Sequence, residues 1–514
     1  MPDRRSFLAA LAAAGAAAAM PGGARPRPRF ASDPFSLGVA SGYPRPDGAV
    51  IWTRLAPDPS RGDGGLDPVG IPVRWEVARD ERFCALAASG NVQAGPEWAH
   101  SVHVEPNGLE PDRWYWYRFF AGDAASPAGR MRTAPRPDAA PSRLRFAFAS
   151  CQQYEQGYFT AWRHMTAEDL DLVVFLGDYI YESSWGRRHV RKHGTPEPYT
   201  LEQYRARHAL YKGDADLQAA HRAFPWIATW DDHEVDNDYA GDRPSDGMPR
   251  GEFLLRRAAA YRAYYEHMPL PAAMRPEGAH MRIHTKLAWG SAANFYVLDG
   301  RQYRSPQVCP RRPGGSNVVD PAACSEIADP RRSMLGAAQE AWLDREFAAS
   351  HAAWNIVAQQ TLMAQLDRKP GEGQRFWTDG WDGYPAARRR LLESALARRL
   401  ANPVVIGGDV HMHWVADLKT DFDDPASPVV ATEFVGTSIT SQAMAQEAVD
   451  AALAENPHLR YGRSDRRGYV RAELAAARFT AEMMGLETVK RPDSGIGVLA
   501  RFVVEKGKPG VQRA

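Results

Sequence analysis

Short apolar runs alternate with helical segments over most of this chain, and this alternation restricts the fold more than any other feature of the sequence. The alternation begins at Leu144 and is typical of an α/β domain built in layers. Strands are expected at 144–149, 172–176, 226–229, 294–298, 355–358 and 404–406. Helices are expected at 158–167, 256–266, 339–348 and 386–401. We therefore predict a layered α/β domain over residues 143–514, preceded by a smaller second domain.

The segment before this domain has a different pattern. Short runs rich in β-branched and aromatic residues recur between about 33 and 133, and turn residues separate them as in a β-sandwich. Leu109 and Pro111 precede a Tyr115-Trp116-Tyr117 run, which resembles the tyrosine corner of fibronectin-like domains. The Pro-rich stretch 134–141 is the expected linker. We predict a small all-β domain of the fibronectin or immunoglobulin type over residues 33–134.

The first thirty residues have the organisation of an export signal. Arg4 and Arg5 precede Ser-Phe-Leu and an Ala-rich apolar stretch that runs to Met20, followed by small residues. The paired arginines resemble a twin-arginine signal, which exports proteins that have already folded. The alternative is an Ala-rich helix with a chance pair of arginines. We predict a twin-arginine signal peptide at 1–30, the twin-arginine export machinery as a partner, and a secreted or periplasmic protein.

The charge of the chain is balanced, with 63 basic and 62 acidic residues and a formal net charge of +1. This balance argues against general binding to nucleic acids or to membrane surfaces. Beyond the signal, no stretch reaches the roughly 20 apolar residues of a membrane-spanning helix. We expect no nucleic-acid-specific partner and no stable membrane span.

The chain has four cysteines, and we expect them to have different roles. Cys309 and Cys324 flank a loop rich in Pro, Gly and Asn, and an oxidising compartment allows them to form a disulfide. Cys84 is expected to be a buried, unreactive thiol. Cys151 remains unpaired and directly follows an apolar strand, which makes it a candidate metal ligand.

Four of the predicted strands end in residues that bind metals. These residues are Cys151 after the first strand, Asp178 and Tyr181 after the second, Asp231 to Asn237 after the third, and Asp409 and His411 after the last. In layered α/β folds, sites form where the carboxyl ends of strands converge. Thiolate, phenolate and imidazole favour a transition metal, whereas carboxylate and amide oxygens favour Ca²⁺ or Mg²⁺. Each motif alone has a simpler interpretation as a turn, a helix cap or a small core residue, but the four together indicate a metal centre.

These motifs resemble those of the metallophosphoesterase superfamily, and most closely its PhoD-like branch of alkaline phosphatase/phosphodiesterases. The matching segments are 148–152, 177–182, 230–234, 299–304, 381–385 and 408–411. The wider superfamily has Asp-x-His at its first strand, whereas this chain has Ser150-Cys151-Gln152, which is the variation of the branch. The resemblance implies a catalytic domain with a β-sandwich core flanked by helices, and a centre of Fe³⁺ and Ca²⁺.

The resemblance also implies which residues hold the two cations. Fe³⁺ would take Cys151, Asp178, Tyr181 and His411. Asp178 would bridge to Ca²⁺, which would also take Asp409 and one further ligand. That ligand is Asp232 by its offset from His233-Glu234, or Asn237 by residue type, and we prefer Asn237.

Two catalytic side chains are expected beside the cations. Negative charge builds on the phosphate oxygens during the reaction, so a cationic side chain should point inward. Arg256, Arg257 and Arg262 on one predicted helix are the candidates, and we select Arg257. His233 is expected either to protonate the leaving group or to orient Asp178.

We therefore predict an exported phosphoester hydrolase that activates water for in-line attack on phosphorus. Monoesters and diesters remain equal candidates as substrates. An alternative is a wall-associated binding protein whose metals are structural, and another is a metal-assisted carboxylesterase. No Gly-x-Ser-x-Gly motif supports a serine hydrolase. The basic run 187–193 is either a solvated loop or a surface that attracts polyanionic substrates.

Overall fold

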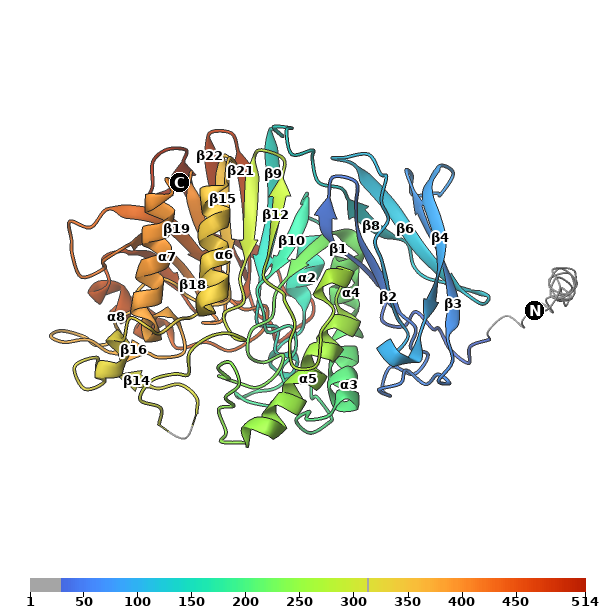
Figure 1. Cartoon of the computed structure of the whole chain (residues 1–514), viewed down its shortest axis with the longest axis horizontal. Coiled ribbons are helices and arrows are strands. Elements are labelled where there is room, and N and C mark those ends of the chain that lie inside the picture. The colour runs from blue at the N-terminus through green and yellow to red at the C-terminus, as the bar shows by residue number, and fades with distance from the viewer. Residues whose placement is uncertain (1–28, 312–313) are drawn as a thin grey trace, which may run out of the picture.

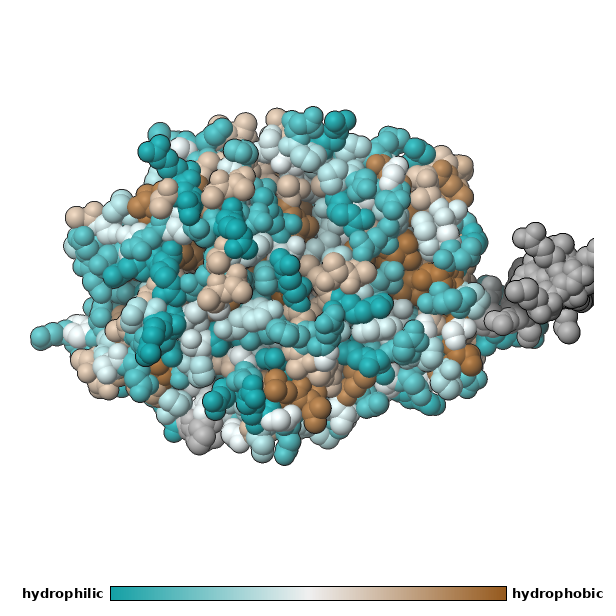
Figure 2. Space-filling view, viewed as in Figure 1, coloured by the Kyte–Doolittle hydropathy of each residue, from teal (hydrophilic) through white to brown (hydrophobic). Residues whose placement is uncertain are grey.

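The computed structural model describes residues 29–311 and 314–514, in which two large sheets carry helices on their outer faces (Figure 1). Arg4, Arg5 and the Ala-rich stretch of the predicted signal lie outside the described residues. Within the described part of the chain, no helix is long and apolar enough to cross a membrane. Hydrophilic residues cover most of the face shown in Figure 2, with smaller hydrophobic areas between them.

The first large sheet has ten strands in the order β24-β23-β22-β21-β9-β10-β11-β1-β2-β5. Its strands are β1 (Val39–Arg45), β2 (Gly48–Arg54), β5 (Ser101–Val104), β9 (Arg143–Ala149), β10 (Leu172–Phe175), β11 (Pro225–Ala228), β21 (Gly468–Ala475), β22 (Arg478–Leu486), β23 (Ile496–Glu505) and β24 (Gln512–Arg513). The central strands β9, β10 and β11 are parallel. Side chains alternate along β9: Phe146 and Phe148 belong to the core between the sheets, and Ala147 and Ala149 to the core under the helices.

The second large sheet has seven strands in the order β12-β13-β15-β17-β19-β18-β20. Its strands are β12 (Thr285–Trp289), β13 (Ala293–Val297), β15 (Trp354–Ala358), β17 (Pro403–Gly407), β18 (His413–Lys419), β19 (Val429–Val435) and β20 (Leu459–Arg463). The two sheets share one apolar core, in which the rings of Phe146 and Phe295 lie 5.3 Å apart. They therefore pack face to face.

Helices cover the outer faces of both sheets. The ten-stranded sheet is covered by α2 (Thr160–Thr166), α3 (Leu201–Lys212), α4 (Ala215–Ala223) and α5 (Arg250–His267). The seven-stranded sheet is covered by α6 (Gly336–Ala348) and α7 (Pro385–Ala397), which lie in front of it in Figure 1. The short helix α8 (Gln446–Glu455) packs against β20, and β14 (Val318–Val319) pairs with β16 (Phe376–Trp377). The resulting layers are helices, sheet, sheet and helices.

A smaller sheet packs on the N-terminal strands of the large one. It contains β3 (Ile71–Ala78), β4 (Leu86–Ala94), β6 (Trp114–Ala121), β7 (Ala124–Ala125) and β8 (Gly129–Arg132). Its core is shared with β1, β2 and β5, and the Tyr115 hydroxyl accepts a hydrogen bond from the Glu110 N–H at 2.9 Å, as in a tyrosine corner. Because β1 pairs in parallel with β11, the ten-stranded sheet continues from the larger α/β part of the chain into this N-terminal part.

Two cysteine predictions have different outcomes. Cys309 and Cys324 are joined by a disulfide, which confirms the prediction for this loop. Cys84 is exposed, so the prediction of a buried thiol is wrong. Cys84 lies in the turn between β3 and β4, where the carboxylate of Asp80 accepts the N–H of Cys84, and its side chain therefore stays at the surface.

Candidate metal centre

The carboxyl ends of β9, β10, β11 and β17 bring the predicted motifs to one place. Cys151 lies two residues beyond β9, Asp178 three beyond β10, and Asp409 two beyond β17. The backbone φ of Cys151, Asp178, Asp409 and His411 lies between +58° and +61°. Left-handed backbone at non-glycine residues costs about 1–3 kcal/mol and is concentrated at functional sites. Four of the predicted metal ligands therefore lie in sharp turns of this kind.

Gly177 allows two of these turns to approach each other. Its φ is +113°, a conformation that favours glycine. A Cβ at this position would lie 2.5 Å from the Cβ of Asp231, which is closer than real contacts allow. The Gly177-Asp178 pair is thus explained by the close approach of the turns after β10 and β11.

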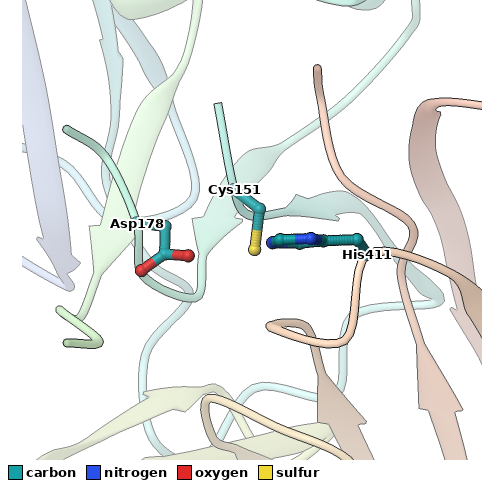
Figure 3. A group of neighbouring side chains, drawn as sticks. All are labelled: Cys151, Asp178 and His411. Carbon is teal, nitrogen blue, oxygen red and sulfur yellow. The ribbon is translucent and has the colours of Figure 1, made fainter. Parts of the chain in front are cut away.

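Cys151, Asp178 and His411 form the centre of the site. Their ligand atoms all lie within 4.8 Å of one another. Figure 3 shows the sulfur of Cys151 between the carboxylate of Asp178 and the ring of His411, with each residue on a different segment. The Tyr181 hydroxyl donates to Asp178 Oδ2 at 2.7 Å and lies 3.2 Å from His411 Nε2. The four residues predicted to bind one cation therefore converge.

The electrostatics of this group favour a bound cation. Burial and the nearby carboxylates raise the pKa of Cys151 and of Asp178, and burial also raises the pKa of Tyr181. Burial lowers the pKa of His411 to about 3, so its imidazole is neutral at neutral pH. His411 Nδ1 donates to the carbonyl of Gln442 at 2.7 Å, which leaves the lone pair on Nε2. A positive ion would stabilise the thiolate, carboxylate and phenolate together.

Two carboxylate oxygens of the predicted metal ligands lack a partner. Asp178 Oδ1 and Asp409 Oδ2 are buried and accept no hydrogen bond in the part of the chain that the structure describes. Buried acceptors are normally paired, so these oxygens suit a cation. As whole residues, Asp409 and His411 are only half-buried, and the site is therefore open to solvent on their side.

A second group contains Asp178, Asp232 and His233, whose ligand atoms also lie within 4.8 Å of one another. His233 Nδ1 lies 2.6 Å from Glu182 Oε2. Although burial lowers the pKa of His233, Glu182, Asp232 and Asp178 raise it well above its usual range. The surrounding carboxylates therefore favour the protonated form of His233.

Asp232 and Asn237, the two candidates for the further Ca²⁺ ligand, differ in their surroundings. Asp232 is buried, and its carboxylate accepts the N–H groups of His233 at 2.9 Å and Asp238 at 2.8 Å. Asn237 is exposed, and its N–H donates to Glu182 at 3.1 Å. The buried cluster thus contains Asp232, whereas the preferred Asn237 lies at the solvent edge, because the turn that begins at Asp232 carries the chain outward.

Two of the three guanidinium nitrogens of Arg257 bind backbone carbonyls. Its guanidinium donates to the carbonyls of Ala279 and Gly241 and ties α5 to two loops. Arg256 pairs with Asp236 at 2.9 Å and Glu197 at 2.6 Å, and Arg262 pairs with Glu266 at 3.2 Å. Nε and Nη1 of Arg257 therefore have structural partners, and a role of Arg257 beside the phosphate stays a prediction.

The sequence did not indicate the role of Arg301. Its buried guanidinium contacts Asp231, lies 2.7 Å from Asp379 and lies 3.5 Å from Asp232. Arg304 adds a second contact to Asp379 at 2.6 Å. Both arginines belong to the 299–304 motif, whose match to the family was the only available signal. The two arginines balance the acidic residues behind the centre.

Glu234 is a second residue whose role the sequence did not indicate. Its carboxylate accepts the N–H groups of Asp178, Tyr179 and Asp231, and so joins the turns after β10 and β11. Burial raises the pKa of Glu234 more than these hydrogen bonds lower it, and the net value is about 8. The Glu of the Asp-Asp-His-Glu motif is therefore a residue that positions the turns.

In the basic run 187–193, some side chains make structural contacts and others are exposed at the surface. Arg191 pairs with Asp214 at 2.6 Å and lies over the ring of Tyr154. Arg187 is exposed, and its N–H donates to Gln442, the residue whose carbonyl accepts from His411. Part of the run thus lies near the open side of the centre.

Comparison with known proteins decides the family. The profile of the PhoD-like phosphatases matches residues 146–483, and that of their N-terminal domain matches residues 18–135. The chain belongs to the PhoD-like phosphatase family. It is 45% identical over 496 residues to alkaline phosphatase D of Bacillus subtilis (strain 168), which covers 95% of this chain and 83% of the relative. The family and the enzyme class predicted from the motifs are therefore confirmed.

A solved structure described as that of PhoD agrees over the same extent. It aligns with a TM-score of 0.89 at 45% identity and covers 95% of this chain and 93% of that chain. This PhoD-like phosphatase therefore shares its fold over both the N-terminal sheets and the catalytic layers.

Proposed function

We propose that this PhoD-like phosphatase hydrolyses phosphoesters at the cluster of Cys151, Asp178, Tyr181, Asp409 and His411. The observation that carries the proposal is the convergence of a thiol, a phenol, an imidazole and unpartnered carboxylate oxygens at one solvent-accessible edge. The layers of helices and sheets support a metallophosphoesterase-type domain over 143–514, and the tyrosine corner supports a fibronectin-like domain over 33–134.

The donor set fits two cations of different character. Cys151, Tyr181, His411 and Asp178 suit Fe³⁺, because thiolate and phenolate stabilise a strong Lewis acid. Asp409, Asp178 and either Asp232 or Asn237 suit Ca²⁺, which prefers oxygen ligands. When bound, the two cations would polarise the phosphate and lower the pKa of the water that attacks phosphorus in line with the leaving group.

Side chains of the protein fix the positions of the metal ligands and can donate a proton to the leaving group. Asp178 belongs to both buried groups, so its carboxylate fixes their separation. His233 is held by Glu182, and the neighbouring carboxylates raise its pKa, so it is suited to donate a proton to the leaving-group oxygen or to hold Asp178. Arg301 and Arg304 balance the carboxylates behind the centre and keep their positions fixed.

Hydrolysis of aryl esters tests the proposal. Protein loaded with iron and calcium should hydrolyse 4-nitrophenyl phosphate and bis(4-nitrophenyl) phosphate, and should not hydrolyse 4-nitrophenyl acetate. A calcium chelator should remove the activity and added Ca²⁺ should restore it, because Asp409 and Asp178 offer oxygen ligands. Full activity after exhaustive chelation would exclude Ca²⁺, and acetate as the better substrate would exclude phosphoester hydrolysis.

Colour tests the iron assignment separately. Thiolate and phenolate on Fe³⁺ give charge-transfer absorption in the visible range, so the purified protein should be coloured. Tyr181→Phe should shift or remove this band, and Cys151→Ala should reduce the iron content. Tyr204→Phe, a buried tyrosine on α3, serves as the matched control. An active, colourless enzyme that contains zinc and no iron would disprove the iron assignment without disproving hydrolysis.

We also propose export by the twin-arginine route, on the basis of Arg4 and Arg5 before Ser-Phe-Leu. The double substitution Arg4→Lys, Arg5→Lys should leave the enzyme inside the cell, because the export machinery reads the arginine pair. Fractionation of cells that produce each form measures this. Export at the wild-type level by the double variant would contradict the proposed route.

A further inference from the structure

Arg368, half-buried in the loop between β15 and β16, makes no side-chain hydrogen bond or ion pair with the described residues, and its guanidinium lies 5.5 Å from the centre of the Trp377 ring. Its Nε is buried without a hydrogen-bond partner in the described part of the chain. Burial lowers the pKa of Arg368, and Asp382 and Asp409 raise it. Asp382 is already bound to Arg388 at 2.6 Å and to the N–H of Leu366 at 2.9 Å. A guanidinium that has no counter-ion of its own is stabilised when an anion binds to it.

Arg368 lines an apolar groove of about 340 Å³. Trp414 and Met444 form two of its walls, Ala448, Ala451 and Ala452 of α8 form another, and Glu455 is the one acidic residue among the described residues of its lining. The Trp414 Nε1 is a second buried donor for which the described residues provide no partner. The volume is at the lower end of the range for ligand pockets, about 300–1,000 Å³, and suits one ring.

The walls of the groove are linked to the centre by short stretches of chain. Trp414 lies three residues after His411, at the start of β18. Met444 lies two residues after Gln442, whose carbonyl holds His411 Nδ1 at 2.7 Å. Arg368 is close enough to Asp409 for this carboxylate to affect its pKa. The groove is therefore on the Asp409–His411 side, where the centre is open to solvent.

We infer that Arg368 and this groove form the subsite that binds the substrate beside the centre. Arg368 binds a non-bridging oxygen of the phosphoester, and the apolar walls hold one ring-sized organic substituent. The inference deepens the proposed function and rests on it. Arginine suits this position because its planar guanidinium matches phosphate oxygens. The enzyme should consequently favour phosphoesters that carry an apolar or aromatic group over those of small polar alcohols.

Two substitutions separate the two parts of the subsite. In the metal-loaded enzyme, Arg368→Gln should raise KM for bis(4-nitrophenyl) phosphate and Ki for inorganic phosphate by about tenfold or more, the expected size for loss of a charge-assisted hydrogen bond. Ala451→Trp should fill the groove and raise KM for the aryl diester, with Ki for inorganic phosphate unchanged. In both variants kcat should change little, as expected when binding alone is lost. Arg368→Lys should restore part of the affinity.

Matched controls come from the same loop and from a comparable groove. Arg375 is exposed in the same loop, and Ala397 is an exposed alanine that lines a groove of about 530 Å³ between α6 and α7. Arg375→Gln and Ala397→Trp should leave KM and Ki unchanged. Iron content and the thermal midpoint, measured for every variant, should equal those of the wild type.

The possible failures can be distinguished. Unchanged KM and Ki in Arg368→Gln would overturn the role of Arg368, as would a lowered thermal midpoint with unchanged KM. An unchanged KM in Ala451→Trp would overturn the role of the groove. In each case the proposed function stands if the wild-type enzyme still hydrolyses aryl phosphoesters. If the wild-type enzyme lacks this activity, both the proposed function and the subsite are disproved.

Discussion

Asp178→Asn should lower kcat for 4-nitrophenyl phosphate by about a hundredfold to a thousandfold or more, the range expected when a preorganised charged group is removed from a catalytic site. Asp178 is the residue shared by both buried groups, and its Oδ1 is buried without a partner among the described residues. Asparagine has nearly the same shape but supplies no negative charge to a cation. Steady-state kinetics, together with iron and calcium analysis, measure the effect.

The control for this substitution is an aspartate away from the centre. Asp216 on α4 pairs with Arg163 at 2.8 Å, and Asp216→Asn should retain full activity. Circular dichroism should show the same secondary structure for both variants. Activity of Asp178→Asn within tenfold of the wild type would show that this carboxylate is not shared between the cations.

Arg301→Gln should destabilise the protein by about 3–5 kcal/mol, the usual cost of removing one partner from a buried ion pair. Arg301 contacts Asp231, Asp379 and Asp232 in a region closed to solvent. Without the guanidinium these carboxylates repel one another, so activity should also fall as the turn after β11 moves. Denaturant unfolding of the metal-loaded protein measures the loss.

Arg331→Gln is the matched control, because Arg331 pairs with Asp329 at the surface at 2.7 Å. Exposed ion pairs contribute little, so this variant should unfold at the wild-type midpoint. A wild-type midpoint for Arg301→Gln as well would mean that the acidic residues behind the centre do not need the arginine.

The sequence predicted the centre of the fold well for a physical reason. Buried parallel strands need continuous apolar runs, and β9, β10 and β17 have such runs in the sequence. Polar residues that follow these runs must lie at the carboxyl edge of the sheets, and the positions of Cys151 and Asp178 therefore follow from the chain order alone. The predicted strands at 144–149 and 355–358 agree with β9 and β15 within one residue.

Other features depend on contacts between distant segments, which a local pattern does not contain. The helices α3 and α4 and the C-terminal strands β18 to β23 were not predicted, although they cover or extend both sheets. Antiparallel pairing of β21 with β9 joins residues more than three hundred positions apart, for example Val470 and Phe148. The direction of Arg257 also follows from how α5 packs, and not from its position in the helix.

The most direct test of the central claim is a crystal structure of the metal-loaded protein with phosphate, with anomalous scattering recorded at the iron edge. The predicted result is an iron atom bound by Cys151, Tyr181, Asp178 and His411, a second cation at Asp409, and phosphate bound to both cations. Metal and phosphate bound elsewhere, with Cys151 and Asp178 free, would contradict the assignment of this cluster as the phosphoester-hydrolysing centre.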